Sequence, residues 1–97
     1  MEKNLIAVTT LCSHYEIELS FVHALEHNGL IQVEIVREEP CLPEDQIRDF
    51  EKMIRLHHEL NLNIEAIDVI FNLLQKEEKL RAELDALKNR LKRYELQ

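Results

Sequence analysis

The apolar and polar positions of the first thirty residues predict a short strand followed by two helices. Residues 5–8 form an apolar run typical of a brief β-strand. Either residue of the Thr9-Thr10 pair can cap the first helix, because a threonine hydroxyl accepts hydrogen bonds from unpaired backbone amides. After a tight turn at residues 16–18, a second helix is expected over residues 19–28. It should stop there because Asn and Gly enter the left-handed conformation at little cost, and Gly29 follows.

The apolar period changes to two in the next segment, which predicts a β-hairpin. Ile31, Val33 and Ile35 lie at alternate positions, as side chains do on one face of a strand. The turn is expected at residues 37–40 and the return strand at Cys41-Leu42. Together these residues would form a small wing.

Helical spacing returns at Pro43 and continues almost to the end of the chain. Pro43 suits the first turn of a helix, where its missing N–H costs nothing. An apolar stripe follows as far as Leu60, and the Asn61-Leu62-Asn63 segment interrupts it, with Asn63 placed to cap a further helix. The residues expected to face the core from these two helices are Ile47, Phe50, Ile54, His57, Ile64, Ile67, Ile70, Phe71 and Leu74.

The last segment carries a seven-residue repeat that predicts a coiled coil. Its seam, with the a and d spacing of paired helices, consists of Leu80, Leu84, Leu87, Leu91 and Tyr94. Glu77 is the polar exception and hints at a joint within residues 72–76, so residues 64–96 could form one helix or two. The alternative for the seam is packing against its own domain. We expect pairing with a second chain, because an isolated helix of this length is marginal in water. The chain would then consist of a head (residues 1–75) and a dimerisation helix (residues 76–97).

Composition and charge agree with a small helical protein that binds other proteins. The 97 residues include one Gly and two Pro, a scarcity that favours long helices joined by short turns. The net charge is −7 and is unevenly spread: residues 1–75 hold five Lys or Arg against fourteen Asp or Glu, and residues 76–97 hold seven against five. An acidic body with a basic tail favours a basic protein partner or self-association over nucleic acid.

The sequence offers little for catalysis or metal binding. It contains no glycine-rich phosphate loop and no nucleophile motif, so we expect neither an enzyme nor a cofactor. His23 and His27 have metal-ligand spacing, but no motif completes the set, and a solvated helix face is the preferred interpretation. Cys12 and Cys41 form no CxxC motif. We expect reduced thiols in a cytoplasmic protein without a signal peptide or membrane span, with a disulfide between them as the less favoured alternative.

Two stretches resemble a known family of regulators. Residues 6–30, with "NGLI" at residues 28–31, and the segment "LPEDQIRDFEKMIRLHHELNLNIEAIDVI" resemble the winged helix-turn-helix head of the MerR family. The motif "RLHHEL" at residues 55–60, followed by "LN", is more closely similar to the CbpM chaperone modulators. This resemblance implies a mainly α, MerR-like winged helix-turn-helix head with a small β-hairpin wing and a C-terminal coiled-coil helix. It further implies binding to the J-domain of a DnaJ/CbpA-like co-chaperone, which would block engagement of DnaK, and an antiparallel helix pair.

The chain departs from the MerR pattern where that family contacts DNA. The second helix offers Ser20, His23, Glu26 and His27, where a DNA-reading helix carries cations. The wing likewise holds three glutamates and Arg37. Since phosphate contacts require Lys or Arg, DNA binding is disfavoured.

The acidic residues are the expected partner-binding surface. J-domains have a basic helix that engages DnaK, so the resemblance and the charge of the head favour the same kind of partner. The alternative is that these acids only confer solubility. The residues expected to contact the partner are Asp45, Asp49, Glu51 and Glu59, which can ring the exposed side of the third helix, with Glu16, Glu18 and Glu26 on the head.

Three functions follow from these observations, in order of preference. The first is a homodimeric, non-enzymatic regulator of a J-domain co-chaperone. The second is a MerR-type DNA-binding transcriptional regulator. The third is a dimerisation adaptor without a J-domain target.

Overall fold

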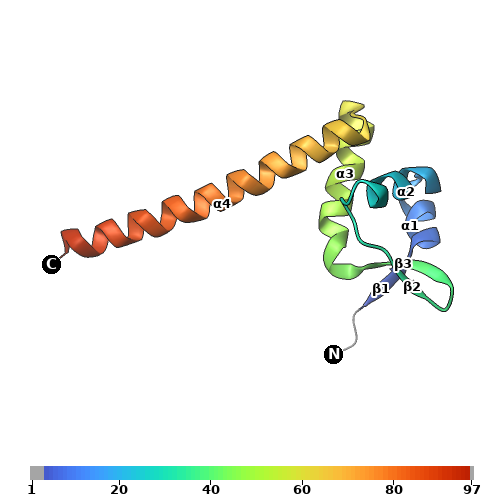
Figure 1. The fold of residues 1–97 in the computed structure, drawn as a ribbon, viewed down its shortest axis with the longest axis horizontal. Coiled ribbons are helices and arrows are strands. Elements are labelled where there is room, and N and C mark those ends of the chain that lie inside the picture. The colour runs from blue at the N-terminus through green and yellow to red at the C-terminus, as the bar shows by residue number, and fades with distance from the viewer. Residues whose placement is uncertain (1–3, 97) are drawn as a thin grey trace.

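The computed structural model describes residues 4–96 and consists of a small folded head from which one long helix projects (Figure 1). The elements are β1 (Leu5–Ala7), α1 (Val8–Tyr15), α2 (Leu19–His27), β2 (Glu34–Val36), β3 (Glu39–Pro43), a 3-10 turn (Glu44–Gln46), α3 (Ile47–Leu60) and α4 (Ile64–Glu95). The order confirms the predicted fold class: two short helices, a wing and a long C-terminal helix.

The N-terminal strand belongs to the same sheet as the wing. β1 pairs antiparallel with β3, with Leu5 opposite Pro43 and Ala7 opposite Cys41, and the strand order is β1-β3-β2. The predicted threonine cap is wrong, because α1 begins directly at Val8 after Ala7, without a side-chain cap. The chain stays extended as far as Ala7 because these residues pair with β3. The helix begins at the next residue, Val8, whose side chain is buried in the core at 1% exposure.

The end of α2 agrees with the expectation from Asn28-Gly29. Gly29 has a φ of 74°, and its N–H donates to the Glu26 carbonyl. The N–H of Leu30 reaches back to the Leu25 carbonyl at 2.9 Å. These two bonds satisfy carbonyls that a helix end otherwise leaves unpaired, which is why the helix stops there.

The hairpin is shorter and tighter than the alternating pattern predicted. β2 covers only Glu34–Val36, and Val36 pairs directly with Glu39. The turn is therefore the two residues Arg37 and Glu38, with φ values of 51° and 65°. Two consecutive left-handed residues match the twist of the strands in a type I′ turn, although neither is the Asn or Gly that this turn favours.

Pro43 does not open α3, as the sequence had suggested. It is the last residue of β3, with an extended ψ of 141°, and α3 starts four residues later at Ile47. The backbone N–H of Glu44 donates to the Asn4 carbonyl at 2.9 Å, so the strand pairing continues past the proline. Sheet pairing thus overrides the local preference of proline for a first helical turn.

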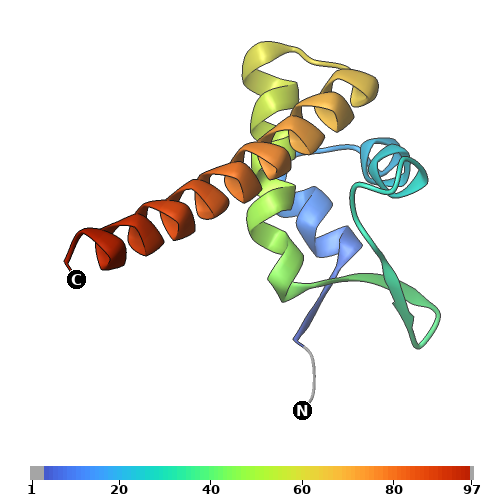
Figure 2. The ribbon, with the colours of Figure 1, turned by 60° about the vertical axis from the view of Figure 1, so that its left-hand side comes forward.

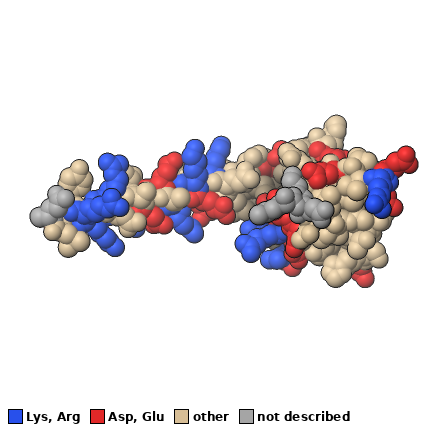
Figure 3. Space-filling view, turned by 90° about the horizontal axis from the view of Figure 1, so that it is seen from below, with Lys and Arg blue, Asp and Glu red and all other residues tan. Residues whose placement is uncertain are grey.

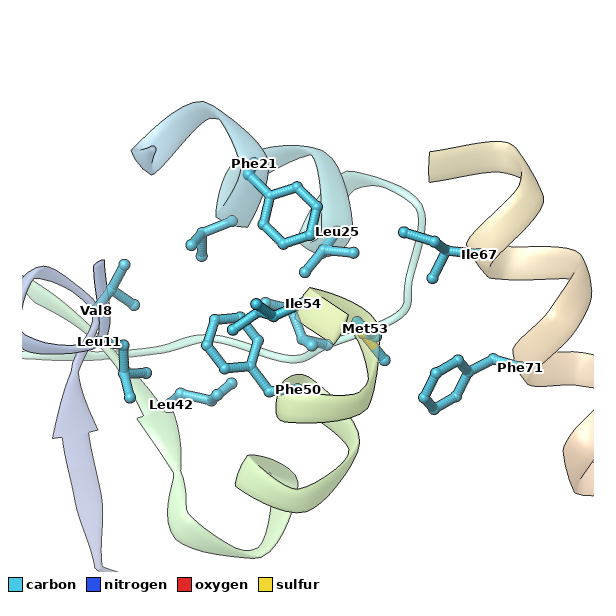
Figure 4. Close-up of a cluster of buried hydrophobic side chains, with 12 residues drawn as sticks. Val8, Leu11, Phe21, Leu25, Leu42, Phe50, Met53, Ile54, Ile67 and Phe71 are labelled. Carbon is cyan, nitrogen blue, oxygen red and sulfur yellow. The ribbon is translucent and has the colours of Figure 1, made fainter. Parts of the chain in front are cut away.

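One apolar core joins the helices and the sheet of the head. Side chains from α1, α2, β3 and α3 meet around Phe50, which is fully buried, and α4 contributes Ile67 and Phe71 (Figure 4). One predicted core position is wrong. Leu74 is 43% exposed, because α4 diverges from α3 beyond Phe71, its last buried residue.

The turn between α3 and α4 is fixed by side chains that the sequence singled out. Asn61 takes the left-handed conformation, and the Asn63 side chain accepts a hydrogen bond of 2.9 Å from the Ala66 N–H, which confirms the predicted cap. Nδ1 of His57 lies 2.9 Å from the Leu62 carbonyl, and its ring stacks on Phe21 of α2 at 4.6 Å. His57, which was expected to face the core, is half-buried and hydrogen-bonded.

α4 is one continuous helix of 32 residues, so the hinted joint at residues 72–76 is absent. Every described residue beyond Phe71 is exposed, and the helix leaves the head at an angle to α3 (Figure 2). The alternative in which the leucine seam packs on its own head is therefore wrong. The expected boundary after residue 75 falls inside α4, about one turn past the last buried side chain.

Candidate protein-interaction surfaces

The leucine seam forms an uncovered apolar face along α4. Leu80, Leu84, Leu87, Leu91 and Tyr94 are between 50% and 72% exposed. Burying a leucine side chain is worth roughly 1.5–3 kcal/mol, so an uncovered row of four is a strong drive towards association.

The apolar face extends towards the head beyond Leu80. Leu73, which belongs to the same seven-residue repeat, and Val69 are 58% and 57% exposed and continue the face at helical spacing. With a rise of 1.5 Å per residue, the face from Val69 to Tyr94 is about 38 Å long. The i, i+4 spacing of Val69 and Leu73 was visible in the sequence, but only the structure shows that the head leaves both uncovered.

Glu77, the polar exception in the seam, forms an ion pair within α4. Its carboxylate lies 2.6 Å from the guanidinium of Arg81, one turn later. Both side chains border the shallow apolar hollow formed by Leu73, Leu80 and Leu84 on the seam. Both side chains are exposed, and glutamate is a good helix former, so α4 continues through this position.

The seven acidic residues expected to bind the partner are all exposed, but they do not form one cluster. Glu16 and Glu18 flank the turn between α1 and α2, where Glu18 accepts a 3.3 Å hydrogen bond from Ser20. Glu26 lies on α2, and Glu59 lies near the C-terminus of α3. Asp45 lies in the 3-10 turn that precedes α3, and Asp49 lies in the first turn of α3.

Asp49 and Glu51 lie on opposite flanks of α3. Asp49 faces α4, where it lines a hollow with Phe71. Glu51 faces α1: it accepts a side-chain hydrogen bond from Tyr15, and burial together with the Glu51 charge raises the pKa of that tyrosine. The ring of Tyr15 also packs edge-on against Phe50 at 5.9 Å. Glu51 is therefore an exposed residue that contacts Tyr15, whereas Asp49 borders an open hollow.

The exposed side of α3 is not the acidic ring that we expected. Arg48, Lys52 and Arg55 are exposed there at spacings of four and three residues, which places them on one stripe. These are three of the five Lys and Arg in residues 1–75. Glu59 continues this stripe one turn after Arg55, and Asp49 and Glu51 lie at its flanks, so the exposed side of α3 carries both charges.

The two thiols are free, and neither is fully exposed. Cys41 is buried in β3, and Cys12 packs beside the core on α1, where burial raises its pKa. The disulfide alternative is therefore wrong for this structure. Among residues 4–96, no group of three or more His, Cys, Asp or Glu side chains is arranged to hold a metal ion. No helix in that same range combines the length and the apolar character needed to cross a membrane.

Comparison with known proteins shows the family. Residues 6–89 match the model of the MerR HTH family regulatory proteins. Two proteins named Chaperone modulatory protein CbpM, from two strains of Pseudomonas putida, are each 31% identical over 86 residues, which is 88% of this chain and 85% of theirs. The chain belongs to the CbpM family of MerR-like proteins. No solved structure shows a significant match.

Membership of the CbpM family changes how the helix-turn-helix is interpreted. α2 occupies the place of a DNA-reading helix, yet residues 19–27 contain no Lys or Arg, and Ser20, His23, Glu26 and His27 are all exposed. The wing exposes Arg37 between acidic neighbours. A MerR-like fold thus presents no Lys or Arg on α2, while the names of the matching relatives refer to chaperones.

Proposed function

We propose that this CbpM-family protein binds the J-domain of a DnaJ/CbpA-like co-chaperone and blocks its engagement of DnaK, without enzymatic activity. The observation that carries this proposal is the match to proteins named as chaperone modulators on a scaffold whose reading helix lacks cations. A J-domain presents a basic helix, and an acidic head attracts such a partner and speeds their encounter. This function would place the protein in the cytoplasm.

The protein acts as a homodimer in this proposal, with Leu80, Leu84, Leu87 and Leu91 buried between two α4 helices. Charge favours an antiparallel pair. Residues 65–78 of α4 carry one Lys against four Asp or Glu, a net −3, whereas residues 88–95 carry four Lys or Arg against one Glu, a net +3. The far end of α4 is visibly basic in Figure 3. An antiparallel pair brings opposite ends together, whereas a parallel pair would place the two basic ends side by side.

Binding kinetics with an isolated J-domain test the proposal. We expect Asp45→Lys combined with Asp49→Lys to slow association about tenfold or more while changing dissociation much less, since steering acts on the encounter. Glu51 is left intact because it contacts Tyr15. The matched control is Glu83→Lys with Glu95→Lys on the tail, which should leave association nearly unchanged.

Surface plasmon resonance on variants whose circular dichroism matches the wild type would measure both rates. Undetectable binding of the wild type at low salt would refute the proposed partner. A tail variant that loses binding while the head variant keeps it would show that α4, and not the head, is the docking surface.

The match to MerR regulators supports DNA binding as the second candidate function. We expect the wild type to show no non-specific DNA affinity even at low salt. Replacing Ser20, His23 and Glu26 by Lys should create such affinity, because each phosphate contact requires a cation. Fluorescence anisotropy with a random duplex would measure it. Wild-type binding with a steep salt dependence would favour the DNA-binding function instead.

A further inference from the structure

Residues of α3 and α4 line a hollow on a face of α4 next to the leucine seam. Its volume is about 280 Å³. Phe71, which is 7% exposed, closes its base, and Leu74, which is 43% exposed, lies on its wall. The hollow is large enough for one or two apolar side chains and too small for a helix.

Acidic residues line both arms of this hollow. Asp49 borders it from α3 and Glu78 from α4, and Asp45 extends the acidic flank of α3 by one turn. Two cations are also present. Arg81 is neutralised by its 2.6 Å ion pair with Glu77, which leaves Lys52 as the opposing charge. The hollow therefore combines an apolar floor with a net acidic rim.

Pairing through the leucine seam leaves this hollow open. The seam residues Leu73, Leu80 and Leu84 line one face of α4, and Phe71, Leu74 and Glu78 line another. The Glu77–Arg81 ion pair lies on the ridge between the two faces, since both residues border both hollows. A dimer would thus carry two such hollows, one at each end.

We propose that the hollow between α3 and α4 is the seat of the basic J-domain helix, which lies across its mouth and inserts an apolar side chain against Phe71 and Leu74. Lysines or arginines on either side of that side chain would pair with Asp49 and Glu78. This inference rests on the proposed function, which supplies the partner, and it names the surface. Docked aromatic or aliphatic side chains in such hollows carry much of the energy of an interface, and the charged rim sets its orientation.

Titration calorimetry of the full-length dimer with an isolated J-domain tests this inference through matched pairs. Leu74→Ala should raise the dissociation constant about tenfold, whereas Leu60→Ala, at a more exposed leucine outside the hollow, should change it less than about twofold. Glu78→Lys should weaken binding by a similar factor, whereas Glu83→Lys on the same helix should not. Thermal melts would show that each pair is equally folded.

The possible outcomes distinguish a failure of the proposed binding site from a failure of the proposed function. A wild type that binds, together with Leu74→Ala and Glu78→Lys variants that bind as tightly, would overturn the seat and leave the proposed function intact. A wild type that does not bind the J-domain would overturn both. If Leu74→Ala and Glu78→Lys instead weaken self-association in sedimentation experiments and leave J-domain binding unchanged, the hollow belongs to the dimer and the inference is wrong.

Discussion

Leu84→Asp is expected to convert the protein from a dimer into a monomer with an intact head. Leu84 lies at the middle of the seam, and in a symmetric dimer the substitution occurs twice. Losing two buried leucines removes roughly 3–6 kcal/mol, because each contributes about 1.5–3 kcal/mol. The dissociation constant should therefore rise by at least about a hundredfold, given that 1.4 kcal/mol corresponds to tenfold. Sedimentation at tens of micromolar would measure the change.

The head should survive this substitution because its core lies elsewhere. The buried cluster ends at Phe71, and Leu84 is three to four turns further along α4. Ala82→Asp is the matched control: it adds the same charge to the same stretch of helix, on the face away from the seam. We expect that variant to remain dimeric. A wild type that sediments as a monomer, or equal effects of both variants, would contradict pairing through the leucine seam.

The sequence predicted those parts of the fold that depend on local spacing and capping. The apolar stripe identified Phe50, Ile54, Ile67 and Phe71 as core residues, and all four are buried. Such patterns succeed because a helix places residues three and four apart on the same face whatever surrounds it. Asn63 succeeded for a similar reason, since a helix start needs an acceptor for its own unpaired amides.

The errors lie where distant segments compete with local preference. Neither the threonine pair nor Pro43 reveals that β1 pairs with β3, yet that pairing decides where both α1 and α3 begin. Glu77 suggested a joint in the last helix because it is the polar position in the leucine seam. In the structure the helix is continuous, and the Glu77 carboxylate forms an ion pair with Arg81 one turn later. The first strand of the wing is shorter than the alternating pattern predicted. Ile31 fits that pattern because its side chain is buried in the core, but it does not belong to a strand.

The candidate site was only partly accessible from the sequence. The seam could be identified because it is a repeat within one helix. The hollow between α3 and α4 could not, because it depends on the angle between two helices. That angle is set by the Asn61–Asn63 turn and by the contact of His57 with the Leu62 carbonyl. Sequence spacing places Asp49 and Glu78 on their helices, but only the turn geometry places them around one hollow.

Replacing Arg37-Glu38 with Asn-Gly is expected to stabilise the head. Both residues are held in the left-handed conformation, with φ values of 51° and 65°, which costs an L-residue with a Cβ roughly 1–2 kcal/mol. Asn and Gly adopt that conformation readily in a type I′ turn, and the flexibility of Gly in the unfolded chain takes back about 0.5–1 kcal/mol. The net gain should be about 1–3 kcal/mol, which corresponds to a melting temperature roughly 5–15 °C higher in a domain of this size.

Calorimetry of the wing variant is best done in the Leu84→Asp background, since dimerisation makes the melting temperature depend on protein concentration. Glu39→Gly is the matched control. It lies next to the turn but within β3, paired with Val36, so a glycine there should destabilise the hairpin by roughly 0.5–1 kcal/mol. If Asn-Gly melts no higher than Arg-Glu while Glu39→Gly behaves as expected, the left-handed pair costs this protein nothing. The two residues would then owe their place in the turn to contacts that compensate for their conformation.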